Sequence, residues 1–323
     1  MSILIIKMGA LGDLIMSTPL IRQIIGHHAS EQVWLLTSPA FARVFQDWQG
    51  LQVKALPRKG ALVMLQTLYW IRRGRFRRLY DLQSSERTAV LCSLSGVPER
   101  AGNHPGPAYH FHPADRYTGQ CHAQQRLNQI LASAGVEPSL DAPFLPISAA
   151  SQVRVSTWLD KNGLRDRSFV LMHAGASSAH PHKRWPCFLE LAAKLKSSGL
   201  ETLWLGGKED TELNNTLASR TGVNTAGLFS VQEEAELGRH ARFAVTNDSA
   251  PMHILSCSGI PVFGLFGPTN WRRTHAIGQQ QYVISLDTGN GPAAPFKPHN
   301  MADITVDHVL AMLTSSRVIL DHY

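Results

Sequence analysis

The N-terminal stretch from Ile3 to Asp13 constrains the fold of this 323-residue chain more than any other segment. Ile3–Ile6 is an unbroken run of branched aliphatic residues, which is typical of a strand buried on both faces of a parallel sheet. A glycine-bounded turn follows, and a helical pattern opens at Asp13. Asp13 is therefore expected at the carboxyl edge of the sheet, where open α/β folds bind ligands. There its carboxylate could cap a helix or act as a base.

Segments of strand and helix character alternate through the rest of the chain. Strands are expected at 33–36, 53–56, 80–83, 168–172, 202–205, 243–246 and 262–266, and helices at 61–71, 88–94, 123–134, 185–197, 251–257 and 306–313. Such alternation predicts βα units and therefore parallel sheets.

The length and the loop composition predict two domains. Residues 103–120 are rich in His, Pro and Gly and are expected to form an irregular loop, whereas Pro138–Ser148 contains three prolines and is the best candidate for a linker. We expect an α/β protein in which two similar domains, 1–150 and 151–323, have parallel sheets facing a central cleft. The C-terminal helix is expected to pack back on the first domain.

Composition and charge narrow the possible functions. Apolar residues make up 44% of the chain, too many for disorder, and the longest apolar runs are too short to cross a bilayer. The N-terminal apolar run is short and ends at Lys7, so no secretory signal is expected there. The four cysteines have no metal-binding spacing, and free thiols in a reducing cytoplasm are expected. Residues 1–150 carry a net charge of +6 and the remainder +1. The first domain therefore faces a phosphorylated substrate, a membrane surface or nucleic acid, or it is simply a solvated basic face.

Two segments of the second half have the composition of phosphate-binding loops. Strand 168–172 is followed by small residues, the hydroxyls of Ser177 and Ser178, and Lys183 just before a helix. Asp248 could cap the helix after strand 243–246, and Ser249 and Ala250 would offer free N–H groups to phosphate oxygens. His253 in the first turn could donate to the same phosphate or be structural. An ordinary strand–helix loop remains the alternative for Lys183.

A third glycine-framed turn, Gly264–Thr269, ends the next strand on the same sheet edge. Three such turns on one edge favour a ligand site over coincidence. The sequence has no DxD pair where a divalent ion would be wanted, so no metal and no cofactor are expected.

Taken in order, these motifs resemble those of glycosyltransferase family 9, the lipopolysaccharide heptosyltransferases. The resemblance rests on Gly12-Asp13, Lys183-Arg184-Trp185-Pro186, Thr246-Asn247-Asp248-Ser249 with His253, and Phe266-Gly267-Pro268-Thr269, and it runs from Ile3 to about Leu313. It implies a GT-B fold of two Rossmann-like domains, with the donor held mainly by the second and the acceptor by the first. It also implies an inverting, metal-independent transfer from ADP-L-glycero-D-manno-heptose to the lipopolysaccharide inner core.

The resemblance also implies roles for single residues. Asp13 matches the general base, and Lys7 matches a lysine near it. Lys183 matches the lysine on the donor phosphates, and Glu209 matches the acidic residue that holds the adenosine ribose. The diphosphate-binding helix start is matched by Asp248, Ser249, Ala250 and His253. The sequence departs from the family in its His- and Pro-rich loop 179–182 and in Ala250, where the family commonly has Gly.

Basic residues of the first domain are the candidates for acceptor binding. Arg72 and the arginines that follow it up to Arg78, with Arg58, Lys59 and Arg126, could contact the phosphates and carboxylates of the acceptor or the anionic inner leaflet. A peripheral location on the inner face of the inner membrane is therefore expected. The alternatives are a solubilising surface or nucleic acid, for which the sequence has no recognised motif.

Three other functions remain to be weighed. A family-9 enzyme could use another donor sugar or another acceptor. A Rossmann oxidoreductase would need GxGxxG after the first strand, and here Asp13 places a carboxylate where the pyrophosphate would lie, which counts against it. A non-catalytic module would bind a nucleotide sugar without turnover and would have no use for Asp13.

Overall fold

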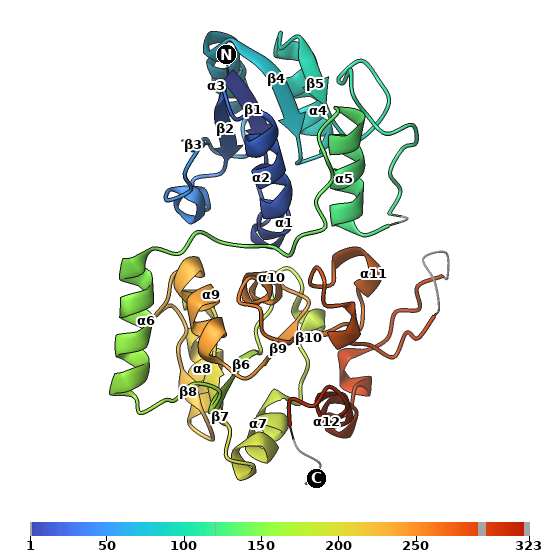
Figure 1. The fold of residues 1–323 in the computed structure, drawn as a ribbon. Coiled ribbons are helices and arrows are strands. Elements are labelled where there is room, and N and C mark those ends of the chain that lie inside the picture. The colour runs from blue at the N-terminus through green and yellow to red at the C-terminus, as the bar shows by residue number, and fades with distance from the viewer. Residues whose placement is uncertain (1, 120, 290–294, 320–323) are drawn as a thin grey trace. The chain divides into compact units, whose positions relative to one another are not determined.

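The computed structural model describes residues 2–119, 121–289 and 295–319, and Figure 1 shows their fold. The chain divides into two compact units, Met1–Pro146 and Ile147–Tyr323. The division falls inside the proline-rich segment 138–148, where residues 139–147 belong to no helix or strand.

The first unit is built on a parallel five-stranded sheet with the order β3-β2-β1-β4-β5. Its strands are β1 (Ser2–Ile6), β2 (Gln32–Thr37), β3 (Leu51–Ala55), β4 (Phe76–Asp81) and β5 (Glu99–Ala101). Ile3–Ile6 in the central strand are completely buried, which explains why the sequence there is aliphatic on both faces.

Helices cover both faces of this sheet. They are α1 (Leu11–Met16), α2 (Thr18–His27), α3 (Ala61–Gly74), α4 (Glu86–Leu94) and α5 (Ala123–Ser133), with a 3₁₀ turn at Ala42–Phe45. Figure 1 shows α2 and α5 together on one face, and α3 packs with α4 on the other. On that second face, Leu4 and Ile6 join Ile71 of α3 and Leu91 of α4 in one core.

The second unit is built on a parallel six-stranded sheet with the order β11-β10-β9-β6-β7-β8. Its strands are β6 (Phe169–His173), β7 (Glu201–Trp204), β8 (Val223–Asn224), β9 (Ala244–Asn247), β10 (Val262–Leu265) and β11 (Val283–Ile284). Because β9 and β6 are neighbours, the loops that follow them leave the sheet side by side. The predicted α/β fold with two parallel sheets is therefore confirmed.

Two layers of helices flank the second sheet. They are α6 (Ala149–Lys161), α7 (Phe188–Ser197), α8 (Thr211–Ala218), α9 (Val231–His240), α10 (Ala250–Ser256), α11 (Trp271–Thr274) and α12 (Val306–Ser315). Val170 and Met172 pack on one face with α7 and α12, whereas Phe169 and Leu171 pack on the other with α6, α9 and α10. The alternation of β6 side chains thus supplies both cores.

Several expectations require correction. The apolar residues Val309 and Leu313 of α12 are buried in the core of the second unit, and the expected packing of this helix on the first unit stays a prediction. The first helix begins at Leu11, so Asp13 is its third residue. The helices α6 and α9 were not expected. No helix in the described part of the chain is long and apolar enough to span a bilayer.

Candidate functional site

Asn247, the last residue of β9, joins the loops that carry the predicted donor residues. Its buried amide nitrogen donates to the carbonyl oxygens of Ala174 and Gly175 at 3.1 and 2.9 Å. Its amide oxygen accepts from the backbone nitrogen of Trp185 at 3.0 Å. One side chain therefore fixes both ends of the loop that contains Lys183. Sequence analysis did not single out Asn247, although a buried asparagine at a strand end inside a motif could have drawn attention to it.

Lys183 forms an ion pair with Asp248. Its Nζ lies 2.8 Å from Asp248 Oδ2, and the two side chains are 20% and 10% exposed. Ser249, rather than Asp248, occupies the N-cap position of α10, so the predicted helix-capping role of Asp248 is wrong. The carboxylate instead holds the ammonium group of Lys183 at the edge of the sheet, with further support from Thr274 at 3.5 Å.

His173, the last residue of β6, connects two further elements of the same edge. Its Nδ1 lies 3.1 Å from the hydroxyl of Ser249, and its Nε2 lies 3.5 Å from Asp210 Oδ2. Burial disfavours the ionised form of Asp210, but His173 and the N–H of Gly207 more than offset it and hold the pKa of this carboxyl below its usual range. Neither His173 nor Asp210 was predicted as a site residue.

Close packing around Asp210 requires glycine at two positions. A Cβ added at Gly175 would collide with the Asp210 carboxylate, and one added at Gly206 would lie 2.6 Å from its Oδ2. The small residues of the loop after β6 therefore leave room for the Asp210 side chain, in addition to any room that they leave for a ligand.

Two glutamates lie near Asp210. Glu209 is exposed in the 3₁₀ turn Lys208–Asp210 after β7, and its role in ribose binding stays a prediction. Glu234 is buried on α9. Its burial is the main cause that raises its pKa to about 8, and the negative charges of Asp210 and Glu209 add to the shift. Glu234 is therefore largely protonated at neutral pH, which limits the negative charge at this edge.

The remaining predicted donor residues differ in exposure. Ser177 and Ser178 are exposed directly after the buried end of β6, and Ala250 is half-buried at the start of α10. His253 is buried within α10. The structure thus brings Lys183, Asp248 and Ser249 together but places the His253 side chain among buried groups.

In the first unit, Asp13 lies where β1 delivers the chain into α1. Its Oδ2 accepts a hydrogen bond from the Ala10 backbone nitrogen at 3.3 Å, and the side chain is half-buried. Lys7 is buried and donates to the Leu82 carbonyl at 2.9 Å. Burial lowers the pKa of Lys7, while the charges of Asp13 and Asp81 oppose that shift. Asp13 therefore closes its own turn and has a cationic neighbour.

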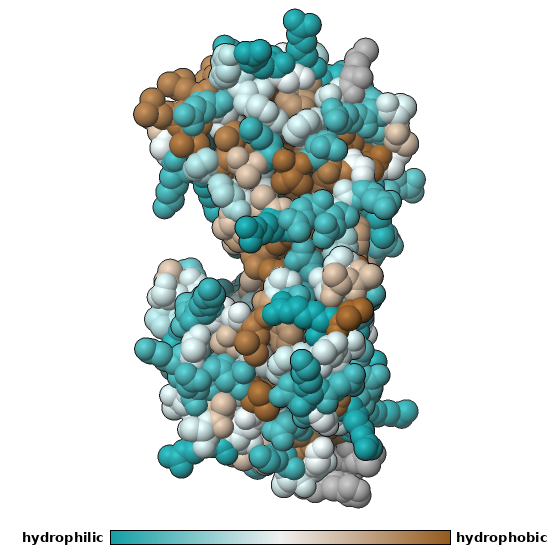
Figure 2. Space-filling model, turned by 90° about the vertical axis from the view of Figure 1, so that its left-hand side faces the viewer, coloured by the Kyte–Doolittle hydropathy of each residue, from teal (hydrophilic) through white to brown (hydrophobic). Residues whose placement is uncertain are grey.

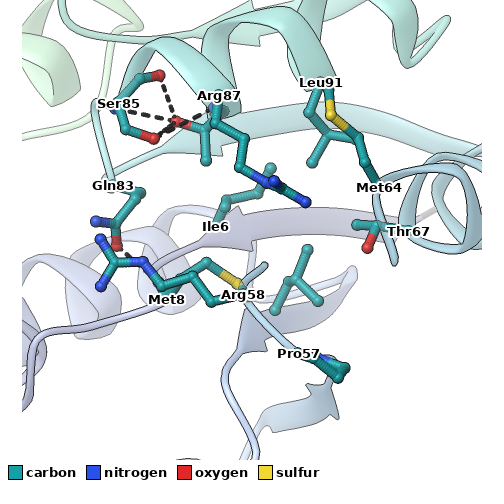
Figure 3. A pocket seen from close by; sticks show the side chains of 12 residues that line it. Ile6, Met8, Pro57, Arg58, Met64, Thr67, Gln83, Ser85, Arg87 and Leu91 are labelled. Atoms are coloured by element: carbon teal, nitrogen blue, oxygen red, sulfur yellow. Dashed lines mark hydrogen bonds between the residues drawn. The ribbon is translucent and has the colours of Figure 1, made fainter. Parts of the chain in front are cut away.

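A pocket opens beside the end of β1 (Figure 3). It contains about 440 Å³ of space free of atoms, including open solvent. The lining residues are Ile6, Met8, Leu36, Pro57, Arg58, Met64, Thr67, Gln83, Ser85, Arg87, Thr88 and Leu91. Figure 3 shows Arg58 next to Gln83, whose side-chain oxygen accepts from the Met8 backbone nitrogen at 2.8 Å. The pocket combines an apolar wall with two arginines, Arg58 and Arg87.

The predicted basic cluster does not stay together. Arg126 is buried, and its guanidinium bonds Asn103, Asp115 and Gln129, so it holds the irregular loop in place instead of facing an acceptor. Arg77 and Arg78 of β4 form ion pairs within the unit. Lys59 and Arg72 are exposed, and Arg72 donates to the Leu94 carbonyl.

Both units are Rossmann-like, and the second holds the Lys183 ammonium group at the carboxyl edge of its sheet, which is the architecture of the GT-B fold. Residues 66–299 match the sequence model of glycosyltransferase family 9 (heptosyltransferase). The chain therefore belongs to glycosyltransferase family 9 and is a glycosyltransferase, which confirms the family resemblance.

Full-length relatives agree with this assignment. Lipopolysaccharide heptosyltransferase 2 of Escherichia coli K12 is 25% identical over 342 residues, covering 98% of each chain. A family 9 glycosyltransferase from Veillonella parvula superposes with a TM-score of 0.82 at 20% identity, covering 97% of this chain and 96% of that one. Escherichia coli ADP-heptose lipopolysaccharide heptosyltransferase II gives 0.75 at 20% identity, covering 98% of each chain.

The described residues contain no group of three or more His, Cys, Asp and Glu side chains placed to hold a metal ion. Independence from metal remains a prediction, which is tested below.

Proposed function

We propose that this glycosyltransferase moves heptose from ADP-L-glycero-D-manno-heptose to the inner core of a lipopolysaccharide precursor, with inversion at the anomeric carbon. The observation that carries the proposal is the placement of Lys183, which Asp248 and Asn247 hold at the sheet edge of a family 9 fold. The names of the relatives, which include an ADP-heptose transferase, support this choice of donor and acceptor.

In the second unit, the proposed role of the site is to bind the diphosphate of the donor and to stabilise ADP as the leaving group. The leaving ADP gains negative charge as the glycosidic bond breaks. The Lys183 ammonium and the N–H groups near Ser249 are held in place before the reaction, so they can stabilise that charge without reorganising. Ser177 and Ser178 would donate to phosphate oxygens, and exposed Glu209 would accept from the ribose hydroxyls.

In the first unit, Asp13 is the proposed general base. Inversion requires one base that takes the proton of the acceptor hydroxyl while the oxygen attacks the anomeric carbon from the face opposite ADP. Lys7 is buried in the same unit and close enough to Asp13 for the two charges to interact, so it is the proposed cationic neighbour of the base. The hydrogen bond from Ala10 is compatible with catalysis, because it engages only Oδ2.

The acceptor is proposed to be anionic and to bind the first unit. Exposed Lys59 and Arg72, and Arg58 in the pocket beside β1, are suited to phosphate and carboxylate groups. Such an acceptor would place the enzyme in the cytoplasm, at the inner face of the inner membrane.

Replacement of Asp13 tests the base. Asp13→Asn keeps the side-chain shape but removes the proton acceptor, so transfer should fall by about 10²- to 10⁴-fold while ADP affinity stays nearly unchanged. The measurement is product formation by mass spectrometry together with ADP titration calorimetry. An Asn variant with full transfer activity would refute the role of Asp13, and would leave the donor site untouched.

A thermal-shift comparison of nucleotides tests the donor. Stabilisation by ADP above UDP and GDP is expected, since ligand binding to the folded state raises the melting temperature. A preference for UDP or GDP would favour the family-9 alternative with a different donor, for which Ala250 and the loop 179–182 are the sequence departures. Donor binding without any transfer would favour a non-catalytic module.

A further inference from the structure

A row of large apolar side chains is exposed on α3 of the first unit. Leu62, Leu65 and Tyr69 are 75%, 63% and 62% exposed. Their spacing of three and four residues places them on one face of the helix, opposite the buried residues Thr67 and Ile71. In Figure 2, apolar surface gathers at the left-hand edge of the first unit, with hydrophilic side chains around it. The helix therefore buries one side in the core and leaves another apolar side uncovered.

The neighbouring helix α4 also exposes apolar side chains. Val90 and Leu94, one turn apart on α4, are 49% and 48% exposed. The two helices pack together, and Arg72 of α3 donates from Nε and Nη2 to the Leu94 carbonyl at 3.1 and 2.8 Å. We call the set of Leu62, Leu65, Tyr69, Val90 and Leu94 the α3–α4 surface.

Basic residues border this surface at both ends of α3. Exposed Arg58 and Lys59 precede the helix, and Arg87 of α4 joins them by donating to the Gly60 carbonyl at 2.8 Å. Exposed Arg73 and Arg75 lie at the other end. Residues 57–75 contain no acidic side chain, so their net charge is entirely positive.

Exposed leucines and a tyrosine flanked by arginines are typical of a helix that binds at the interface of a lipid bilayer. Arg73 Nη1 donates to the Tyr69 hydroxyl at 2.8 Å, and its guanidinium lies 5.7 Å from the centre of the Tyr69 ring. The tyrosine and the arginine are thereby held at the border between apolar and charged surface. Leucines in such a position enter the acyl boundary, while arginines bind lipid phosphates.

We propose that the α3–α4 surface docks on an anionic lipid bilayer, with Leu62, Leu65 and Tyr69 inserted and the flanking basic residues on the headgroups. This inference rests on the proposed function in one respect, because an acceptor anchored in lipid would bring the substrate to the same bilayer. A second copy of the chain is a poorer occupant. Two-fold pairing of this surface would bring together two sets of arginines, whereas α3 and α4 supply one acidic residue between them, Glu86.

Vesicle co-sedimentation of the full chain tests the docking. Binding is expected to vesicles of phosphatidylglycerol and phosphatidylethanolamine, weaker in high salt, and much less to phosphatidylcholine alone. Arg73→Gln with Arg75→Gln should lower partitioning roughly 25-fold, since each basic residue near an anionic surface contributes about fivefold. Leu62→Ser with Leu65→Ser should lower it at least about tenfold, from the loss of apolar burial.

Matched controls remove the same groups elsewhere. Leu140→Ser deletes a leucine that is 92% exposed on the same unit, and Lys161→Gln with Lys196→Gln removes two exposed charges from the second unit. These controls should bind vesicles like the unmodified chain. The proposal is overturned if the chain does not bind anionic vesicles, or if the test variants bind as the controls do.

Two further measurements separate membrane docking from self-association and from the proposed transfer function. Sedimentation velocity of the unmodified chain and of the leucine variant compares their self-association. If the unmodified chain is a dimer, the leucine variant is a monomer and the variant still binds vesicles, the surface belongs to a second copy and the docking proposal is overturned. ADP affinity and transfer to a delipidated acceptor should be unchanged in the leucine variant. If the unmodified chain binds vesicles but transfers no heptose, the proposed function fails and the docking stands.

Discussion

The ion pair between Lys183 and Asp248 leads to a quantitative prediction about donor affinity. The two side chains meet at 2.8 Å and are mostly shielded from solvent. Lys183→Ala removes the ammonium group that is proposed to contact the diphosphate, and it also leaves the Asp248 carboxylate unpaired. Both effects weaken the binding of an anion, so the loss should exceed that of a single hydrogen bond.

The magnitude follows from these two effects. A hydrogen bond to a charged group contributes about 1.5–3 kcal/mol. The Asp248 carboxylate left behind would also repel the diphosphate, and two unit charges about 4 Å apart near a protein surface interact by about 4 kcal/mol. ADP affinity should therefore fall at least roughly 30-fold in Lys183→Ala. Adding Asp248→Asn removes the repulsive carboxylate, so the double variant should bind ADP roughly tenfold more tightly than the single variant.

Titration calorimetry with ADP can measure all of these affinities. The matched control is Lys194→Ala on α7, which removes a lysine whose side chain is 40% exposed and pairs with Asp307 at 3.3 Å. Its effect should stay within about 0.5 kcal/mol, as for most surface substitutions. The reasoning is refuted if Lys183→Ala binds ADP like the control, or if the double variant binds no better than the single one.

Three further predictions concern packing, pH and metal. Gly175→Ala forces a Cβ against the Asp210 carboxylate, so melting curves should show a loss of about 1–3 kcal/mol, and an unchanged curve would contradict the packing argument. Glu234 has a pKa of about 8 in the folded chain, against 4.5 when it is exposed, so the folded state binds more protons between these two pH values. The free energy of unfolding should therefore fall as the pH rises from 4.5 to 8. The variant Glu234→Gln should show no such fall, and a fall that persists in this variant would assign it to another group. Transfer activity should survive excess EDTA, and a loss that a divalent ion restores would rule out the metal-free mechanism.

The sequence allowed the elements that carry the site to be located. Ile3–Ile6 of β1 and the residues from Phe169 to Met172 of β6 are fully buried, and a continuous apolar run is a local signal of that burial. The helices α6 and α9 were missed because few apolar residues mark them: α6 buries only Val155 and Leu159, and three glutamates are among the buried residues of α9.

The basic run from Arg72 to Arg78 shows where sequence proximity misleads. The chain passes from helix α3 to strand β4 within it, so the arginines diverge. Arg73 and Arg75 stay exposed, whereas Arg77 and Arg78 turn to Glu31 and Glu99. Periodicity predicted the helix but could not predict which carboxylates would be near the strand.

By itself, the sequence determined the order of most strands and helices, the family, and the positions of Asp13 and Lys183 at strand and helix boundaries. These follow from local hydrophobic patterns and short motifs. The tertiary structure alone decided the partners of the charges. Lys183 and Asp248 are 65 residues apart in the chain, and His173 and Ser249 are 76 apart. Such pairs form because the parallel sheet places the ends of β6 and β9 side by side, and no local pattern records which distant side chains will meet there.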